Sequence, residues 1–95
     1  VLSILTFKDE AEAIALANNS CYGLAAYAAT ENLGRAQRLA RRLNSGYFAV
    51  IGTAAPSGGS ISIGSSPVRQ SGFGCESGLE GLASYTVSTA TYIYA

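Results

Sequence analysis

The chain has 95 residues, enough for one small domain, and its six Lys or Arg side chains balance its six Asp or Glu side chains. Zero net charge argues against nucleic acid and anionic membranes as partners, and no segment reaches the roughly 18 apolar residues of a membrane span. The chain contains no His, which argues against a zinc site and against Cys–His catalysis within it.

The chain is also weakly charged. Charged residues make up 13% of it and hydrophobic residues 48%, whereas about 25% of the residues of a usual soluble domain are charged. We therefore expect apolar surface that a partner covers. Cys21 and Cys75 fit neither a disulfide framework nor a CxxC metal site, so we expect a reducing, cytoplasmic location. The first residues follow a strand pattern without a signal peptide, and we expect them to continue a longer polypeptide.

The first predicted elements are a strand and a helix. Leu2–Phe7 is rich in β-branched and large apolar residues, which predicts a strand buried on both faces. Asp9 is placed to cap a following helix whose first turn is acidic, and Asn18–Ser20 ends that helix. The expected buried stripe of the helix consists of Ala13, Ile14 and Ala17.

Two further strands flank a second helix. Tyr22–Thr30 and Tyr47–Ile51 are short apolar runs that predict strands. Asn32 is expected to cap the helix between them, which ends near Asn44 with Gly46 at the C′ position. Its expected inward stripe is Leu33, Ala36, Ala40 and Leu43. The order strand–helix–strand–helix–strand predicts an α/β layer with right-handed crossovers.

The second helix carries a cationic face. Arg35, Arg38 and Arg42 lie on one side of it, with Arg41 beside them. Such a face could bind phosphate or nucleic acid, but cations also stabilise the C-terminal end of any helix. Because the whole chain is neutral, we interpret these residues as a solvated or interdomain face.

Residues 52–69 show no periodicity, which is unusual for a compact domain unless the loop is functional. They follow the carboxyl end of a predicted strand, where α/β proteins bind ligands. The next segment, 70–84, is rich in glycine and ends in a predicted short helix at Gly78–Ser84. Gly72-Phe73-Gly74 does not meet the G-x-G-x-x-G pattern because Gly78 falls one residue late, so we predict a tight turn rather than a dinucleotide site.

Residues 85–95 consist almost entirely of strand-forming Tyr, Thr, Val and Ile. A strand of this kind without Lys or Pro promotes unwanted pairing in a monomer. We therefore predict that it pairs with a neighbouring subunit.

Four segments together resemble the C-terminal portion of the aldehyde dehydrogenase superfamily. Val1–Ile4 resembles the strand after that family's Glu-(Ile/Leu)-Phe-Gly-Pro motif, and "EAIALANNSCYGLAA" resembles the helix and the YGLAA segment that follow. "RAQRLARRLNSG" resembles the helix and turn before the strand over the substrate tunnel, and "QSGFGCESGLEGLASYT" resembles the closing signature. Each segment alone is a weak signal, but four in order at family spacing are a strong one.

The resemblance implies a fold and an organisation. Residues 1–84 would form the C-terminal part of an α/β catalytic domain, with 52–69 as a tunnel-side loop and 70–84 as a glycine-rich turn and short helix. Residues 85–95 would be an oligomerisation strand of a homodimer or homotetramer. The residues implied for this contact are Tyr85, Val87, Thr89, Thr91 and Ile93.

The resemblance also implies an activity, the oxidation of an aldehyde to a carboxylic acid with NAD or NADP. The family's nucleophilic Cys, its base Glu and its dinucleotide fold would lie upstream, so the chain by itself is expected to hold no cofactor and to be inactive. It would need the rest of the aldehyde dehydrogenase polypeptide as its partner. The implied substrate-tunnel residues are Ile51, Gly52, Thr53 and Ser65.

The sequence departs from the family at three places. Cys75 stands where most members have Arg, Ile51-Gly52 stands where Val-Asn is common, and Ser65 stands where Phe walls the tunnel. Ser65 would make that wall more open and polar.

Two other functions remain open. One is a stand-alone, non-enzymatic α/β module that dimerises by strand addition through residues 85–95, and it is consistent with the lack of any nucleophile–base pair. The other, less favoured, is phosphate binding by the glycine loops and the arginine cluster.

Overall fold

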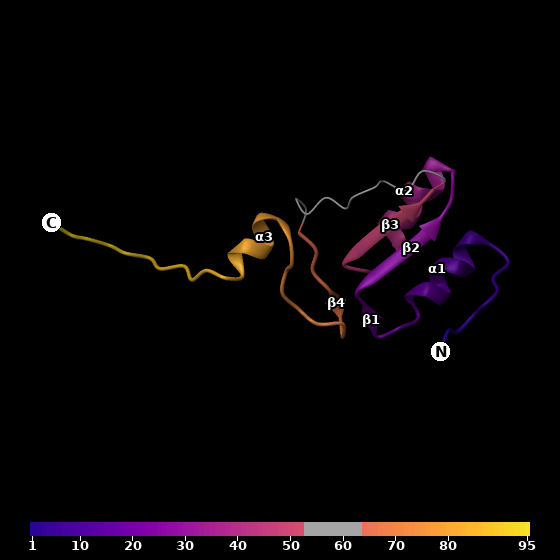
Figure 1. Cartoon of the computed structure of the whole chain (residues 1–95), viewed down its shortest axis with the longest axis horizontal. Coiled ribbons are helices and arrows are strands. Elements are labelled where there is room, and N and C mark those ends of the chain that lie inside the picture. Colours follow the sequence, from indigo (N-terminus) through magenta and orange to yellow (C-terminus); the bar gives the residue numbers. More distant parts are fainter. Residues whose placement is uncertain (53–63) are drawn as a thin grey trace.

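Short polar side chains determine where the two longer helices begin. In the computed structural model, which describes residues 1–52 and 64–95, α1 (Glu10–Asn18) follows Asp9 and α2 (Leu33–Arg42) follows Asn32 (Figure 1). The amide of Glu12 donates to Asp9 Oδ1 at 2.8 Å, and the amide of Arg35 donates to Asn32 Oδ1 at 2.8 Å. Both predicted N-caps are therefore confirmed, because each side-chain oxygen satisfies an amide that the helix leaves free.

The centre of the fold is a parallel pair of strands. β2 (Ala25–Ala29) and β3 (Tyr47–Ile51) pair in register from Ala25–Tyr47 to Ala29–Ile51. The rings of Tyr27 and Tyr47 lie 6.0 Å apart on this pair, tilted by 56°. α2 forms the connection between the two strands, as the predicted strand–helix–strand order requires.

A second, smaller pair joins the later part of the chain to the earlier part. β1 (Tyr22–Gly23) pairs antiparallel with β4 (Val68–Arg69), through Tyr22–Arg69 and Gly23–Val68. The predicted strand 22–30 is therefore split at Leu24, and the region predicted to be irregular contains a strand at its end. After β4 the chain turns through two glycines with positive φ, Gly72 at 127° and Gly74 at 94°. The hydrogen-bonded turn itself lies just before these glycines, where the amide of Ser71 donates to the carbonyl of Val68 at 3.3 Å, and α3 (Gly78–Ala83) follows them.

Three details of the helices differ from the prediction. α2 ends at Arg42, with Leu43 as its C-cap in an extended conformation, so Gly46 is not the C′ residue. Leu33 is 72% exposed; the side of α2 that faces the sheet is defined by its half-buried residues, Ala36, Leu39 and Leu43. In α1 the predicted stripe contributes one buried side chain, Ile14, which is 5% exposed.

Gly46 is required for a close approach rather than for a helix end. A Cβ built on Gly46 would lie 1.6 Å from the carbonyl oxygen of Ser66, a distance that no side chain tolerates. The backbone after α2 therefore lies directly against the backbone that leads into β4. This contact brings residues 64–69 onto the sheet.

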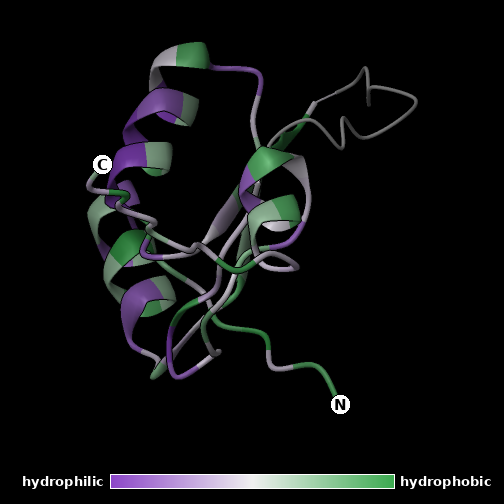
Figure 2. Ribbon diagram, turned by 90° about the vertical axis from the view of Figure 1, so that its left-hand side faces the viewer, coloured by the Kyte–Doolittle hydropathy of each residue, from purple (hydrophilic) through white to green (hydrophobic). Residues whose placement is uncertain are grey.

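The two ends of the chain do not form the predicted strands. Residues 1–7 have no strand pairing and lie exposed, with Leu2 at 84% and Ile4 at 81%, and Figure 2 shows this hydrophobic end projecting from the body. Residues 85–95 leave α3 as an unpaired extended segment (Figure 1). A strand exists only when a neighbouring backbone pairs with it, and this chain pairs neither end.

The unpaired ends make the molecule elongated. Its radius of gyration is 18.0 Å, whereas a compact domain of this length has about 12 Å. Among residues 1–52 and 64–95, Ile14 is the only buried hydrophobic side chain. The described part of the chain therefore has almost no core of its own.

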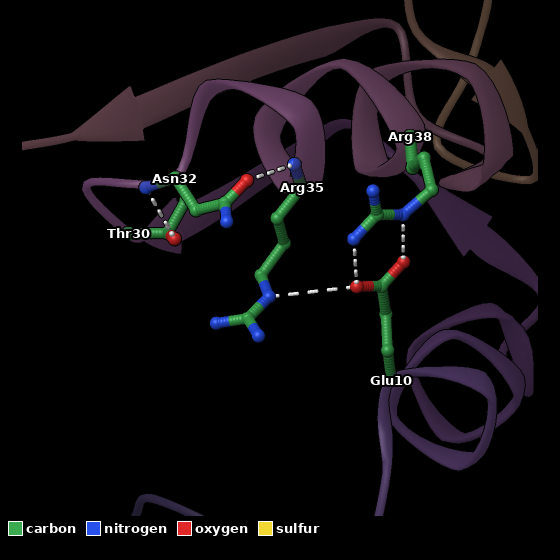
Figure 3. Close-up of polar contacts among 5 residues, drawn as sticks. All are labelled: Glu10, Thr30, Asn32, Arg35 and Arg38. Carbon is green, nitrogen blue, oxygen red and sulfur yellow. Dashed lines mark hydrogen bonds and ion pairs between the residues drawn. The ribbon is translucent and has the colours of Figure 1, made fainter.

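An ion cluster connects the two longer helices (Figure 3). Glu10 of α1 accepts two hydrogen bonds from Arg38 of α2, from Nε at 2.7 Å and from Nη2 at 2.8 Å, and Arg35 Nε lies 3.4 Å from Glu10 Oε2. The hydrogen bonds from Arg38, and the positive charges of both arginines, lower the pKa of Glu10 to about 2. Two of the four arginines of the predicted cationic face are thus paired within the chain, and the side chains of Arg35 and Arg38 stay 53% exposed, which agrees with a solvated face.

We expect Gly46→Ala to destabilise the fold by more than about 2 kcal/mol, because the new methyl group would collide with a backbone carbonyl that cannot move away. Gly52→Ala is the matched control, since no atom of residues 1–52 and 64–95 lies within 4 Å of a Cβ at that position. Thermal unfolding of both variants measures the difference. Equal unfolding temperatures would show that the two backbone segments do not approach each other this closely.

The low pKa of Glu10 predicts a specific loss of stability in acid. Because folding lowers this pKa, the contribution of Glu10 is fully present above its ordinary value of 4.5 and is lost as the pH falls toward about 2. We expect Glu10→Gln to flatten this part of the stability–pH profile, measured as unfolding temperature against pH. Glu31→Gln leaves the Glu10 cluster intact, so its unfolding temperature should fall with decreasing pH as steeply as that of wild type. If both variants flattened the profile equally, the loss of stability in acid would not come from Glu10.

Candidate functional site

A large groove of the described structure lies where the second half of the chain passes the start of the parallel strands. It has a volume of about 780 Å³ and lies between the first residues of β2 and β3, the segment 65–76 and the end of α3. Its lining combines aromatic rings with small polar groups: Leu24, Ala25, Tyr27, Tyr47, Ser65, Ser66, Pro67, Ser71, Phe73, Gly74, Cys75, Glu76, Ser84 and Tyr85. A mostly apolar concave surface with a few polar groups is typical of a small-molecule site.

The structure brings only some of the predicted site residues to this groove. Ser65 and Tyr85 line it. Ile51 ends β3 at the opposite end of the strand, and Gly52 follows it, so neither joins Ser65 in this chain. Thr53 lies outside the described residues. Val87, Thr89, Thr91 and Ile93 lie in the unpaired terminal segment.

Backbone contacts hold the wall formed by residues 65–76. Ser65 and Glu76 form an isolated antiparallel bridge, each amide donating to the other's carbonyl at 2.9 Å. The hydroxyl of Ser84 donates to the carbonyl of Cys75 at 3.4 Å, which connects the wall to the end of α3. The wall is therefore a closed loop whose two ends pair with each other.

The sequence did not predict the aromatic side of the groove. Tyr27 and Tyr47 come from predicted strands, but no local signal shows that their rings meet. The parallel register decides this, because it places Ala25 beside Tyr47 and therefore Tyr27 two residues further along the same face. Phe73 lies between the two glycines of the turn and is 98% exposed.

The groove lacks the groups for covalent catalysis. Cys75 is half-buried, and its Sγ lies 3.8 Å from the carbonyl oxygen of Glu76, a weak contact with no base. Cys21 is exposed, and the sequence has no His that could activate either thiol. In the described part of the chain, no three His, Cys, Asp or Glu side chains lie together as metal ligands. Neither thiol therefore has a base beside it among the described residues.

The described residues do not fit a nicotinamide dinucleotide. Such a cofactor needs a glycine-rich turn between a strand and a helix whose free amides hold the phosphates. The turn between β2 and α2 is Thr30–Asn32, without glycine; it carries the acidic Glu31, and Asn32 already occupies the amide of Arg35. Gly72 and Gly74 lie after β4, and the bridge residue Glu76 separates them from α3, so they do not lead directly into a helix.

The described helices are also all too short or too polar to cross a membrane.

Comparison with known proteins gives a consistent result. The model of the Aldehyde dehydrogenase family matches residues 1–91. The chain is similar to an indole-3-acetaldehyde dehydrogenase variant from P. syringae solved with NAD+ and IAA, with 37% identity over 99% of this chain and a TM-score of 0.81. It is also similar to the aldehyde dehydrogenase KauB from Pseudomonas aeruginosa, with 36% identity over 97% of this chain and a TM-score of 0.81.

A third similar structure is the betaine aldehyde dehydrogenase from Staphylococcus aureus in complex with NAD+, with 38% identity over 85% of this chain and a TM-score of 0.73. The chain spans 18%, 18% and 16% of the lengths of these three solved chains.

Proposed function

The chain belongs to the aldehyde dehydrogenase family, and from this premise we propose that it forms the C-terminal part of the catalytic domain of an enzyme that oxidises aldehydes to carboxylic acids with NAD or NADP. The observation that carries the proposal is the similarity in structure over nearly the whole chain, with a TM-score of 0.81 to enzymes several times its length. Two of these relatives were solved with NAD+, which supports a nicotinamide cofactor.

In this proposal the rest of the polypeptide supplies the chemistry, and this chain supplies part of the substrate site. The 780 Å³ groove has aromatic rings on one side and the wall 65–76 on the other. Ser65 on this wall would contact the aldehyde, and its hydroxyl would admit substrates with polar groups. Ile51 and Gly52 lie at the carboxyl end of β3, away from this groove, and in this proposal they and Thr53 would line another part of the substrate tunnel.

The exposed ends support the same assignment. Residues 1–7 and 85–95 together carry ten of the 21 exposed large hydrophobic side chains of the described residues, such as Val87 at 92% and Ile93 at 86%. Exposed apolar surface with unpaired backbone is covered in a stable protein. We propose that residues 1–7 pair within the remaining catalytic domain and that residues 85–95 pair with a neighbouring subunit of a homodimer or homotetramer.

The alternative is a stand-alone module that dimerises through residues 85–95. The lack of a nucleophile–base pair in the described residues favours it for the chain taken alone. Light scattering of the 95-residue chain distinguishes the two proposals. A stable, well-folded dimer favours the module, whereas aggregation or poor folding favours part of an enzyme.

We expect the complete polypeptide that contains these residues to reduce NAD or NADP in the presence of aldehydes, measured as absorbance of the reduced cofactor. The 95-residue chain alone should give no reduction, because in this proposal the nucleophile, the base and the dinucleotide fold lie in the rest of the polypeptide. Aldehyde oxidation by the isolated chain would refute the proposal.

Ile93→Asp should dissociate the oligomer of the complete polypeptide, because a charge would be buried without a partner at the subunit contact. Ser88→Asp, on the other face of the expected strand, is the matched control and should leave the assembly intact. Light scattering measures the mass of both variants. An unchanged assembly in the Ile93 variant would place the contact elsewhere.

A further inference from the structure

The groove wall is attached to the rest of the fold at one small junction. There β4 pairs with β1 over two residues. The amide of Gln70 donates to the carbonyl of Cys21 at 2.9 Å, and the amide of Gly23 donates to Ser71 Oγ at 2.8 Å. The wall residues lie on both sides of this junction in sequence, Ser65 before it and Phe73 after it. The orientation of the junction therefore determines the orientation of the wall.

Arg69 lies at the centre of the junction in an unfavourable backbone conformation. Its φ is 56°, in the left-handed region that non-glycine residues rarely occupy. Nothing in the pairing of β4 with β1 requires an arginine, since ladder hydrogen bonds use only the backbone. A residue keeps this conformation only where its surroundings compensate for the strain.

The guanidinium of Arg69 contacts two other elements. Nη1 donates to the carbonyl of Asn18 at 2.8 Å and also to the carbonyl of Ser20. With its amide oxygen turned toward the guanidinium, Asn44 accepts from Nη2 and from Nε at 2.9 Å each. The three acceptors come from the end of α1, the turn after it and the loop after α2.

The contacts satisfy groups that each helix leaves free. The last carbonyls of a helix lack partners within it and attract cations, and α1 has no basic residue in its own last turn. Arg69 brings that positive charge from 51 residues further along the chain. Asn18 in turn donates from Nδ2 to the carbonyl of Arg42 at 2.8 Å and accepts from the amide of Asn44 at 2.9 Å.

We propose that Arg69 is a positioning residue for the substrate site: its planar guanidinium locks β4 against the ends of α1 and α2 and so sets the position of the groove wall 65–76. The inference rests on the proposed function only where it concerns the aldehyde. The planar fork of arginine directs its N–H groups toward several acceptors at fixed angles, whereas the ammonium of lysine is a single point. Lysine at this position would keep the positive charge but lose the planar fork that reaches all three acceptors at once.

The first test measures hydrogen exchange in the complete polypeptide. We expect Arg69→Lys and Arg69→Gly to increase the exchange rates of the Gly23 and Gln70 amides about tenfold, because hydrogen bonds from a charged group maintain the junction. Amides in the middle of α2 should exchange as in wild type. Arg41→Lys, an exposed arginine on α2, is the matched control and should change neither set.

Arg69→Gly tests the side chain separately from the backbone conformation. Glycine adopts a positive φ without strain, so this variant can keep the backbone and loses only the guanidinium contacts. If the backbone conformation alone positioned the wall, this variant would exchange like wild type, and that result would overturn the proposal. Asn44→Ala removes one acceptor and leaves Arg69 in place. It should accelerate exchange of the same amides by a smaller factor, which keeps the test decisive if an Arg69 variant fails to fold.

The second test is steady-state kinetics of aldehyde oxidation. We expect Arg69→Lys to raise KM for the aldehyde about tenfold with little change in kcat, because a displaced wall weakens binding without moving the reacting groups. Faster exchange with an unchanged KM would overturn the role toward substrate. If wild type oxidises no aldehyde, the proposed function fails, and the exchange rates alone still decide whether Arg69 holds the wall.

Discussion

The structure depends on one short junction, where β4 returns to β1 and the backbone of Ser66 passes directly over Gly46. Everything after residue 64, including the groove wall and α3, is joined to the first half of the chain there. A two-residue strand pair is a weak attachment by itself. Two further sets of contacts fix the geometry of this junction. One is the close backbone approach that Gly46 permits, and the other is the set of hydrogen bonds from the side chains of Arg69 and Ser71.

The described part of the chain has a very small hydrophobic core. α1, α2 and the pair β2–β3 enclose a single buried hydrophobic side chain among the described residues, Ile14. Polar contacts accordingly take a large share of the connections between elements, such as the Glu10 cluster and the side chain of Asn18. Exposed hydrogen bonds and ion pairs of this kind contribute little free energy each. In the proposed enzyme, apolar burial against the rest of the polypeptide would add stability, and the exposed ends of this chain would be the surface that is buried.

Local signals in the sequence predicted the elements that depend on local chemistry. Asp9 and Asn32 cap their helices as expected because an N-cap involves residues only three positions apart. The apolar run Tyr47–Ile51 forms its strand, and Gly72 and Gly74 adopt the positive φ that glycine allows. The predicted strand at the start of the chain was wrong, because strand formation depends on pairing with a neighbouring backbone. Residues 2–7 have strand composition, but a strand also requires a neighbouring backbone, and composition does not say whether one is present. The inward face of α2 was predicted in part: Ala36 and Leu43 are half-buried as expected, whereas Leu39 takes the place of the exposed Leu33. Leu39 and Leu33 differ in burial only through what lies opposite them.

The sequence by itself determined the family, the helix caps and the parallel order around α2, because each of these depends on residue identity and spacing along the chain. Only the tertiary structure decided which residues meet. It separated Ile51 from Ser65, assembled the groove from Tyr27, Tyr47 and Phe73, and paired half of the arginine face with Glu10. It also placed Arg69 at the end of α1. These contacts join residues up to 51 positions apart, and contacts at such separation depend on how the whole backbone folds rather than on any local pattern.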